Sequence, residues 1–265
     1  MPFTASHAAA ALPLRRSRLV FPAVVIGSFA PDLEYFLRLS PGGGWGHTLM
    51  GALALSLPLG LAVLWLFYRF AWPPIVALLP VSIERRLGCS LQPFGFRGRV
   101  LLIVLSMLAG IATHLAWDSF THIHTWLYFH CSFLRQDIPL PLVGPIRSYF
   151  LLQILSSVAG ILALLFWFFR WYRDTPPGPQ PLGRTFTPWQ KAVIVIAMLT
   201  LSTAGGLLRA FLQFGIPQNR HTVTGFAGDT AVTVGALLWW QLIAWGVLFR
   251  SRVTSFTAHS EPIHR

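Results

Sequence analysis

The segment Ala112-Thr113-His114-Leu115-Ala116-Trp117-Asp118-Ser119-Phe120-Thr121-His122 ends a long apolar run that begins near Val100. Such a run can cross a bilayer as a helix, which takes about 20 residues. On that helix His114, Asp118 and His122 are spaced four residues apart, so their side chains lie along one face. An imidazole and a carboxylate one turn apart can bind the same cation. The segment therefore predicts both a membrane helix and a metal-binding face.

The composition is that of a membrane protein. Hydrophobic residues make up 54% of the 265 residues and charged residues only 11%, which is more apolar than a soluble fold of this length. The formal net charge is +12, but the basic residues are arginines at the ends of apolar runs, with Lys191 as the single lysine. This distribution is typical of charges that flank membrane helices, and it argues against nucleic-acid binding.

Five stretches are apolar and long enough to span a bilayer as helices. They are residues 46–69, 100–119, 148–171, 191–213 and 231–250. A shorter apolar run, residues 19–30, contains Pro22 and Gly27 and predicts a half-spanning or interfacial helix. We therefore expect an all-α fold: a polytopic membrane helical bundle with about five transmembrane helices, preceded by short or half-spanning helices at the N-terminus.

A proline-rich stretch divides the chain. Residues 173–190 contain five prolines and no apolar period, which predicts a cytoplasmic linker. Before it, residues 1–172 form the predicted metal-site membrane domain. After it, residues 191–252 form an accessory pair of transmembrane helices, and residues 253–265 form a disordered tail.

The arginines also predict the orientation of the spans. They follow the first, third and fifth spans, and the positive-inside rule places these regions in the cytoplasm. His47 at the start of the first span then meets His114 and Asp118 at the extracytoplasmic face. Three arginines near the N-terminus lie outside in this topology. Either residues 19–37 cross the membrane, or those arginines bind lipid headgroups.

Acidic residues beside these histidines complete a candidate metal site. Only eight acidic residues occur in the chain, and Asp32 and Glu34 precede His47 by a short loop. Ionisable groups at membrane depth are costly and are by default candidates for function. Two carboxylates and two imidazoles suit Zn²⁺, with Mn²⁺ or Fe²⁺ as alternatives. The four ligands would be Asp32, His47, His114 and Asp118.

Each of these residues also has a simpler interpretation. His47 can face lipid headgroups at the start of a helix, and Asp32 can be a helix N-cap. His114 and Asp118 can form a hydrogen-bonded pair between helices. Glu34 remains open between a general base, a residue that orients a ligand, and a solvated turn residue.

Four short motifs follow one another in a distinctive order. They are Ser6-His7-Ala8, Ala30-Pro31-Asp32-Leu33-Glu34, Gly46-His47-Thr48 and the segment from His114 to His122. Over most of the first 170 residues, the chain resembles an uncharacterised bacterial membrane-protein family known only as a domain of unknown function. More distantly, the succession His, Asp, His and His-x-x-x-Asp is similar to the membrane-bound metal-dependent hydrolases and to zinc-dependent phospholipase C.

The wider resemblance implies a function for the cluster. In those enzymes metal ions hold a water that attacks a phosphoester. The resemblance therefore implies one metal site from Asp32, His47, His114 and Asp118. It also implies that His7 with Asp118 can reach a second ion, although His7, in a run of alanines, can equally be an interfacial side chain.

The chain departs from the phospholipase pattern downstream. Those enzymes continue with a further His and a His-x-x-x-Glu pair, whereas here the histidine after His130 is His221, with no acidic residue four positions later. The uncharacterised family commonly has a His after the Gln of the third span, where this chain has Gln153 followed by Ile154. The first departure argues against a trinuclear site and leaves His122 at its margin, and the second argues against full activity.

Together these observations predict a bacterial inner-membrane metalloprotein that hydrolyses an ester or phosphoester of a lipid or other amphiphile. Metal-bound water would be the nucleophile, and Glu34 or Asp118 the general base. The alternative is a non-enzymatic membrane protein whose His/Asp cluster binds a structural ion or none. An ion or proton conduit would need polar residues through the bundle, and residues 104–111 offer only Ser106. The lipid bilayer is the expected partner, and the oligomeric state is left open.

Overall fold

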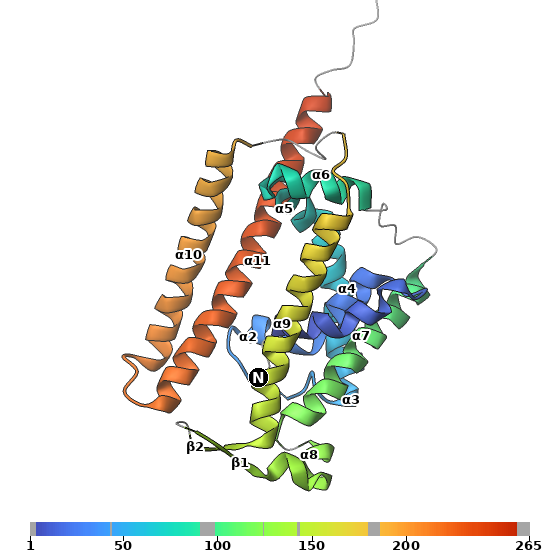
Figure 1. Ribbon diagram of the computed structural model, residues 1–265. Coiled ribbons are helices and arrows are strands. Elements are labelled where there is room, and N and C mark those ends of the chain that lie inside the picture. Colours follow the sequence, from blue (N-terminus) through green and yellow to red (C-terminus); the bar gives the residue numbers. More distant parts are fainter. Residues whose placement is uncertain are drawn as a thin grey trace, which may run out of the picture. The chain divides into compact units, whose positions relative to one another are not determined.

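The computed structural model describes residues 4–42, 44–90, 99–123, 125–141, 144–179 and 186–258. Over these ranges the protein is mostly helical, as predicted, and five helical stretches are long and apolar enough to cross a membrane (Figure 1). They are Leu49–Leu78, Val100–His130, Ser148–Asp174, Pro188–Phe214 and Thr222–Leu248. The protein is therefore a multi-pass helical membrane protein.

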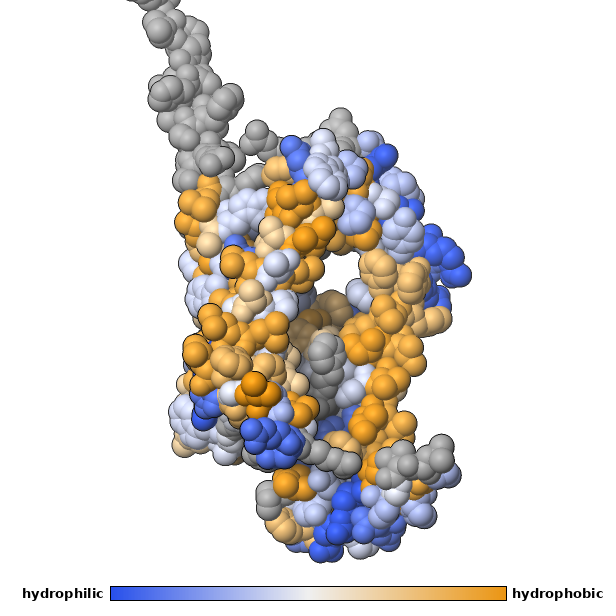
Figure 2. All heavy atoms as spheres, turned by 90° about the vertical axis from the view of Figure 1, so that its left-hand side faces the viewer, coloured by the Kyte–Doolittle hydropathy of each residue, from blue (hydrophilic) through white to orange (hydrophobic). Residues whose placement is uncertain are grey.

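Large apolar side chains are exposed along these helices. On α9 (Ser148–Asp174) Phe166 is 69% exposed, and on α10 (Pro188–Phe214) Leu212 is 76% exposed. In Figure 2 hydrophobic residues follow the helices of one face, and hydrophilic residues concentrate near the helix ends. Exposed apolar area on this scale needs a covering, which the hydrocarbon of a bilayer supplies for membrane helices.

The described chain divides into two compact units. The first comprises Met1–Glu34, Gly43–Leu64 and Gly95–Asp174. Its elements, in order, are η1 (Thr4–Arg16), α1 (Phe21–Gly27), η2 (Ala30–Asp32), α3 (Leu49–Gly51), η3 (Ala52–Ser56), α7 (Val100–Thr121), α8 (Trp126–His130), η5 (Ser132–Arg135), β1 (Asp137–Leu140), β2 (Gly144–Arg147) and α9. The helices α2 (Leu33–Arg38) and α4 (Leu57–Leu66) have residues in both units.

Helix α1 lies against α7 with the two backbones in contact. Gly27 and Gly110 permit this approach, because a β-carbon on either residue would overlap main-chain atoms of the other helix. Ser106 of α7 accepts a hydrogen bond from the main-chain N–H of Val20, just before α1, at 2.8 Å. At seven residues, α1 is about 10 Å long and agrees with the prediction of short N-terminal helices.

The first span extends beyond the predicted residues 46–69. It continues through η4 (Phe67–Ala71) and α5 (Trp72–Leu78), and both η3 and η4 are π-helical. The second π-helical segment ends at Ala71, and α5 begins at Trp72 with Pro73 and Pro74 in its first turn. Proline is tolerated in the first turn of a helix, so the run does not end at Arg69.

A two-stranded antiparallel hairpin between α8 and α9 was not predicted from the sequence. Asp137 of β1 pairs with Arg147 of β2 in the register, and their side chains form an ion pair at 3.2 Å. The main-chain N–H of Ser148 donates to the carbonyl of Gln136 at 2.9 Å. The hairpin therefore leads directly into the start of α9.

The second unit comprises Tyr35–Gly42, Trp65–Phe94 and Thr175–Arg265. It contains η4, α5, α6 (Val81–Ser90), α10 and α11 (Arg220–Ala258). In Figure 1, α10 and α11 run side by side. Gln241 of α11 donates a hydrogen bond to Ser202 of α10 at 2.7 Å, a polar contact of the kind that joins membrane helices.

A buried ion pair also joins α10 to α11. Arg209 Nη1 lies 3.3 Å from Asp229 Oδ2, and Asp229 is 2% exposed. The other carboxylate oxygen of Asp229 accepts a hydrogen bond from Ser40 at 2.8 Å, and Arg209 donates to the carbonyl of Arg38 at 3.1 Å. The charge of Asp229 is therefore compensated within the second unit.

Candidate metal centre

Five ionisable side chains from separate segments of the first unit converge at one buried point. They are His7 on η1, Asp32 at the end of η2, His47 in the turn before α3, and His114 and Asp118 on α7. Their exposed fractions are 3% for His7 and Asp32, 0% for His114 and 7% for Asp118. The side chain of His47 is 21% exposed, which makes it the most accessible of the five.

The atoms that face one another are two imidazole nitrogens and two carboxylate oxygens. His114 Nε2 lies 3.2 Å from Asp118 Oδ2 and 3.7 Å from Asp32 Oδ1. His47 Nε2 lies 3.4 Å from each of the same two oxygens. The Nε2 atoms of His47 and His114 are 3.3 Å apart.

This arrangement could hold a metal ion. Two overlapping groups each have ligand atoms within 4.8 Å of one another: His7, His114 and Asp118, and Asp32, His47 and His114. Carboxylate oxygens and unprotonated ring nitrogens are all acceptors. Their convergence is favourable only when a cation, either a proton or a metal ion, lies among them.

The orientation of His114 is set by a main-chain carbonyl. His114 Nδ1 lies 2.8 Å from the carbonyl oxygen of Ser28, which follows α1. A carbonyl oxygen can only accept a hydrogen bond, so Nδ1 must be the nitrogen that carries the proton. The tautomer leaves the lone pair of Nε2 directed at the cluster, as in histidines that bind metals.

A neighbouring hydroxyl likewise orients the carboxylate of Asp32. Thr4 Oγ1 donates a hydrogen bond to Asp32 Oδ2 at 2.6 Å. The other oxygen, Oδ1, faces the two histidines. The segment η1 therefore contributes an orienting hydroxyl as well as His7.

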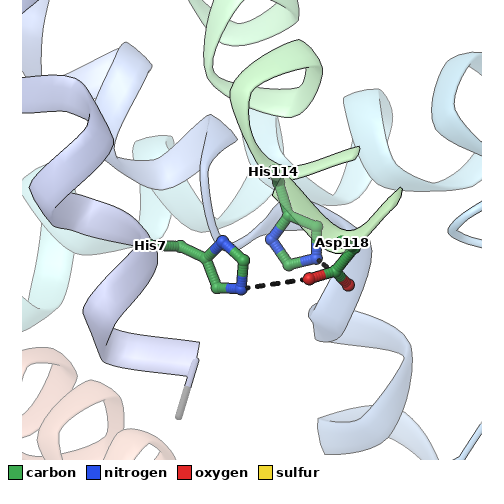
Figure 3. A group of neighbouring side chains, drawn as sticks. All are labelled: His7, His114 and Asp118. Carbon is green, nitrogen blue, oxygen red and sulfur yellow. Dashed lines mark ion pairs between the residues drawn. The ribbon is translucent and has the colours of Figure 1, made fainter. Parts of the chain in front are cut away.

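Asp118 has neighbours on both of its oxygens. While Oδ2 faces His47 and His114, Oδ1 lies 3.5 Å from His7 Nε2 and 3.5 Å from His122 Nδ1. The rings of His7 and His114 are stacked with centroids 4.0 Å apart, and the carboxylate of Asp118 faces a ring nitrogen of each (Figure 3). His122 follows the last residue of α7, and its Nδ1 also lies 3.3 Å from the carbonyl oxygen of Asp118.

Glu34 contacts the turn that carries His47. Its Oε2 accepts a hydrogen bond from the main-chain N–H of Gly46 at 3.1 Å. Glu34 lies in the first turn of α2, two residues after Asp32. The structure therefore gives Glu34 a contact with the main chain beside a candidate ligand.

Burial and charge set the protonation of the groups outside the spans. Burial and the nearby His114 lower the pKa of His7 to about 4. For His47, burial favours the neutral ring, but hydrogen bonds to Asp118 and Asp32 outweigh it and raise the pKa to about 9. For Asp32, burial opposes ionisation, but the hydrogen bond to His47 and the proximity of His114 lower the pKa. At neutral pH the site without a metal therefore has an anionic Asp32, a neutral His7 and a proton on His47.

Three contributors to the site were not predicted from the sequence. The carbonyl of Ser28 has no signal in the sequence, because every residue carries a carbonyl. Thr4 and Ser56 are small polar residues in apolar surroundings, which more often cap or pack helices. Only the tertiary structure brings Thr4 to Asp32 and Ser56 to the turn at Gly46.

Fold and site together define a multi-pass helical membrane protein with a buried His/Asp cluster. The chain belongs to the family described as domain of unknown function DUF4184, whose model matches residues 1–247. The match covers the fourth span and all but the last residue of the fifth, and so extends beyond the first 170 residues that the motifs covered. No curated protein and no solved structure matches the chain.

Proposed function

We propose that this protein is a membrane-embedded, metal-dependent hydrolase that cleaves an ester or phosphoester of a lipid or other amphiphile. The observation that carries the proposal is the convergence of four acceptor atoms: Asp32 Oδ1, His47 Nε2, His114 Nε2 and Asp118 Oδ2. The hydrogen bonds from His114 to Ser28 and from Thr4 to Asp32 support it, because they orient two of these atoms inward.

The spacing of these atoms favours zinc. Ligand atoms about 2.0–2.1 Å from a tetrahedral Zn²⁺ are about 3.3–3.4 Å apart. Five of the six distances among the four atoms are 3.2, 3.3, 3.4, 3.4 and 3.7 Å. An octahedral ion with arms of about 2.1 Å would have neighbouring ligands about 3.0 Å apart. We therefore propose Zn²⁺ as the ion, with Mn²⁺ and Fe²⁺ as less suitable alternatives.

In the proposed reaction the protein supplies orientation and a proton acceptor. Because the four protein ligands fill a tetrahedral shell, a water would have to join bound Zn²⁺ as a fifth ligand, and the ion would then lower its pKa towards neutrality and so supply the nucleophile. Asp118 Oδ1 would accept a proton from this water as the water oxygen bonds to the phosphorus or acyl carbon. The proton would then pass to the alcohol oxygen, whose bond to that phosphorus or carbon breaks. Asp118 suits this role better than Glu34, because Glu34 Oε2 is already bonded to Gly46.

His7 and His122 lie near Oδ1, the carboxylate oxygen of Asp118 that does not face His47 and His114. We propose that His7 Nε2 and Asp118 Oδ1 can hold a second ion, since these atoms are 3.5 Å apart and His7 is 3% exposed; with that ion bound, Oδ1 is a ligand and no longer the proton acceptor. His122 lies at the edge, with a side chain that is 30% exposed. The site therefore opens to its surroundings at His47 and His122, which is where a substrate would enter.

The proposed orientation follows the positive-inside rule. It puts the cluster at the extracytoplasmic face of a bacterial inner membrane, because His47 precedes the first span and Asp118 lies in the C-terminal part of α7. The exposed Arg15, Arg16 and Arg18 then face the outer headgroups. Fusion of a periplasm-active reporter after Arg252 tests this orientation, since the proposal expects no periplasmic activity there.

A structural ion is the second candidate function. The near-complete burial of His7, Asp32, His114 and Asp118 favours it, because a buried ion can hold η1, η2 and α7 together without turnover. In that case metal removal would unfold the first unit, and no ester would be hydrolysed.

The test uses the full chain purified in detergent. Bound metals are measured by mass spectrometry for the wild type, His114→Ala and Asp118→Asn, with His130→Ala as the matched control, since His130 is exposed and its described contacts are with the carbonyl and the ring of Trp126. We expect about one Zn²⁺ per chain in the wild type and the control, and little in the other two variants. Equal metal in all four proteins would refute the site.

Hydrolysis of phospholipids and of soluble phosphodiesters then separates the two functions. The enzyme proposal expects turnover that stops on chelation and returns with Zn²⁺. Bound zinc without turnover on either substrate class would reject the enzyme and support a structural ion.

A further inference from the structure

We infer that Glu34 is a positioning residue that fixes the distance between Asp32 and His47 by holding Gly46 in place. The inference rests on the proposed metal function, because the distance matters for an ion shared by the two residues. It assigns Glu34 a different role from the general base that its sequence position allows.

Gly46 immediately precedes His47, and both of its main-chain polar groups are bonded to side chains. Its N–H donates to Glu34 Oε2 at 3.1 Å, and its carbonyl accepts from Ser56 Oγ at 3.2 Å. Ser56 is fully buried in the π-helical segment η3. The peptide groups on both sides of Gly46 are therefore anchored, and they determine where the side chain of His47 begins.

The same glycine also contacts the segment that carries Asp32. A β-carbon on Gly46 would lie 2.6 Å from the carbonyl oxygen of Pro31, 3.3 Å from Ser56 Oγ and 3.5 Å from Glu34 Oε2. Pro31 immediately precedes Asp32. The residues that precede two candidate ligands therefore touch each other, and any side chain at position 46 would force them apart.

Glu34 links the two segments, because it belongs to the Asp32 segment and its side chain bonds to Gly46 beside His47. It lies two residues after Asp32, in the first turn of α2, and reaches across to Gly46. The Asp32 and His47 segments are thus joined twice, by the Glu34 hydrogen bond and by the Gly46–Pro31 contact. This support is needed because a metal site loses affinity when its ligands move by about 0.5 Å.

A positioning role and a general-base role for Glu34 predict opposite effects for two conservative substitutions. Glu34→Gln keeps an oxygen that can accept the Gly46 N–H, but it removes a carboxylate that could take a proton. Glu34→Asp keeps the carboxylate but shortens the side chain by one carbon, so it cannot reach Gly46 without movement. A positioning residue tolerates Gln better than Asp, and a general base shows the opposite order.

The experiment measures Co²⁺ binding to the metal-free full chain in detergent, using the visible absorption of tetrahedral cobalt. We expect Glu34→Gln to bind Co²⁺ as the wild type does, within about threefold, and Glu34→Asp and Glu34→Ala to bind roughly 10- to 100-fold more weakly with an altered spectrum. Asp137→Ala is the control, because this carboxylate is exposed on the hairpin and pairs with Arg147.

Wild-type affinity and spectrum in both Glu34→Asp and Glu34→Ala would overturn the inference. So would a Glu34→Gln protein that binds Co²⁺ normally but has lost hydrolysis, because Glu34 would then act as a base. If Glu34→Ala does not fold, the comparison of Gln with Asp decides alone. A wild type that binds no Co²⁺ refutes the metal function and the inference together, whereas failure confined to the variants leaves the metal function standing.

Discussion

His114 donates its Nδ1 hydrogen to the carbonyl of Ser28 at 2.8 Å, across the contact between α7 and the end of α1. The bond depends on the close packing of the two backbones at Gly27 and Gly110. It explains why a short helix that does not span the membrane is packed so tightly on one that does. The helix supplies the acceptor that orients a candidate ligand.

Gly110→Ala should therefore damage both stability and metal binding. Its β-carbon would lie 2.8 Å from both the Cα of Gly27 and the main-chain nitrogen of Ser28, so α1 must move away from α7. We expect a loss of about 1–3 kcal/mol in the free energy of unfolding and weaker Zn²⁺ binding, measured by thermal unfolding in detergent and by metal content. Ala112→Ser, on the exposed side of α7, is the control and should match the wild type.

Thr4→Val should weaken metal binding while the helices remain folded. The change removes the 2.6 Å hydrogen bond to Asp32 Oδ2, so the carboxylate is free to rotate and Oδ1 is no longer held towards the histidines. We expect roughly tenfold weaker Zn²⁺ or Co²⁺ binding. Thr4→Ser keeps the hydroxyl and should restore most of the affinity. Equal affinity in the valine and serine variants would contradict this role for Thr4.

Metal affinity should rise with pH between about 6 and 9. Although burial favours the neutral ring, Asp118 and Asp32 raise the pKa of His47 to about 9, so a proton must leave Nε2 before an ion binds. Asp32 has a lowered pKa and stays ionised over this range. We expect the logarithm of the Co²⁺ association constant to increase by up to about one per pH unit below pH 9. A pH-independent affinity would show that His47 is not a ligand.

Asp229→Asn should destabilise the second unit. Asp229 is 2% exposed and pairs with Arg209 at 3.3 Å, and removal of one charge leaves the other partly buried without compensation. We expect a loss of about 3 kcal/mol in the free energy of unfolding, measured by thermal unfolding. Asp174→Asn removes an exposed pair with Arg170 and should change stability by less than about 1 kcal/mol.

The sequence by itself determined the class of protein. Hydropathy is a local property, so runs of about 20 apolar residues identified the five spans that the structure contains. The spacing of His114 and Asp118 is also local, because helical geometry alone puts residues four apart on one face. The sequence could therefore predict a pair of facing ligand atoms, which lie 3.2 Å apart in the structure.

The boundaries of the spans could be determined only from the tertiary structure. The fifth span was predicted to begin near residue 231, after the charged Asp229, but it begins at Thr222. Arg209 and Ser40 compensate the charge of Asp229, and neither partner is near it in sequence. The hairpin of β1 and β2 was missed because its strands have four residues each and no alternating pattern long enough to stand out.

The completed site is also a tertiary property. Asp32, His47 and His7 come from segments far from α7 in sequence, and their convergence depends on the packing of α1 at Gly27 and on the anchoring of Gly46. Such contacts form only when the whole unit folds, since no local spacing encodes a distance between separate segments. The sequence named the residues with the right chemistry, and the fold decided which of their atoms face one another.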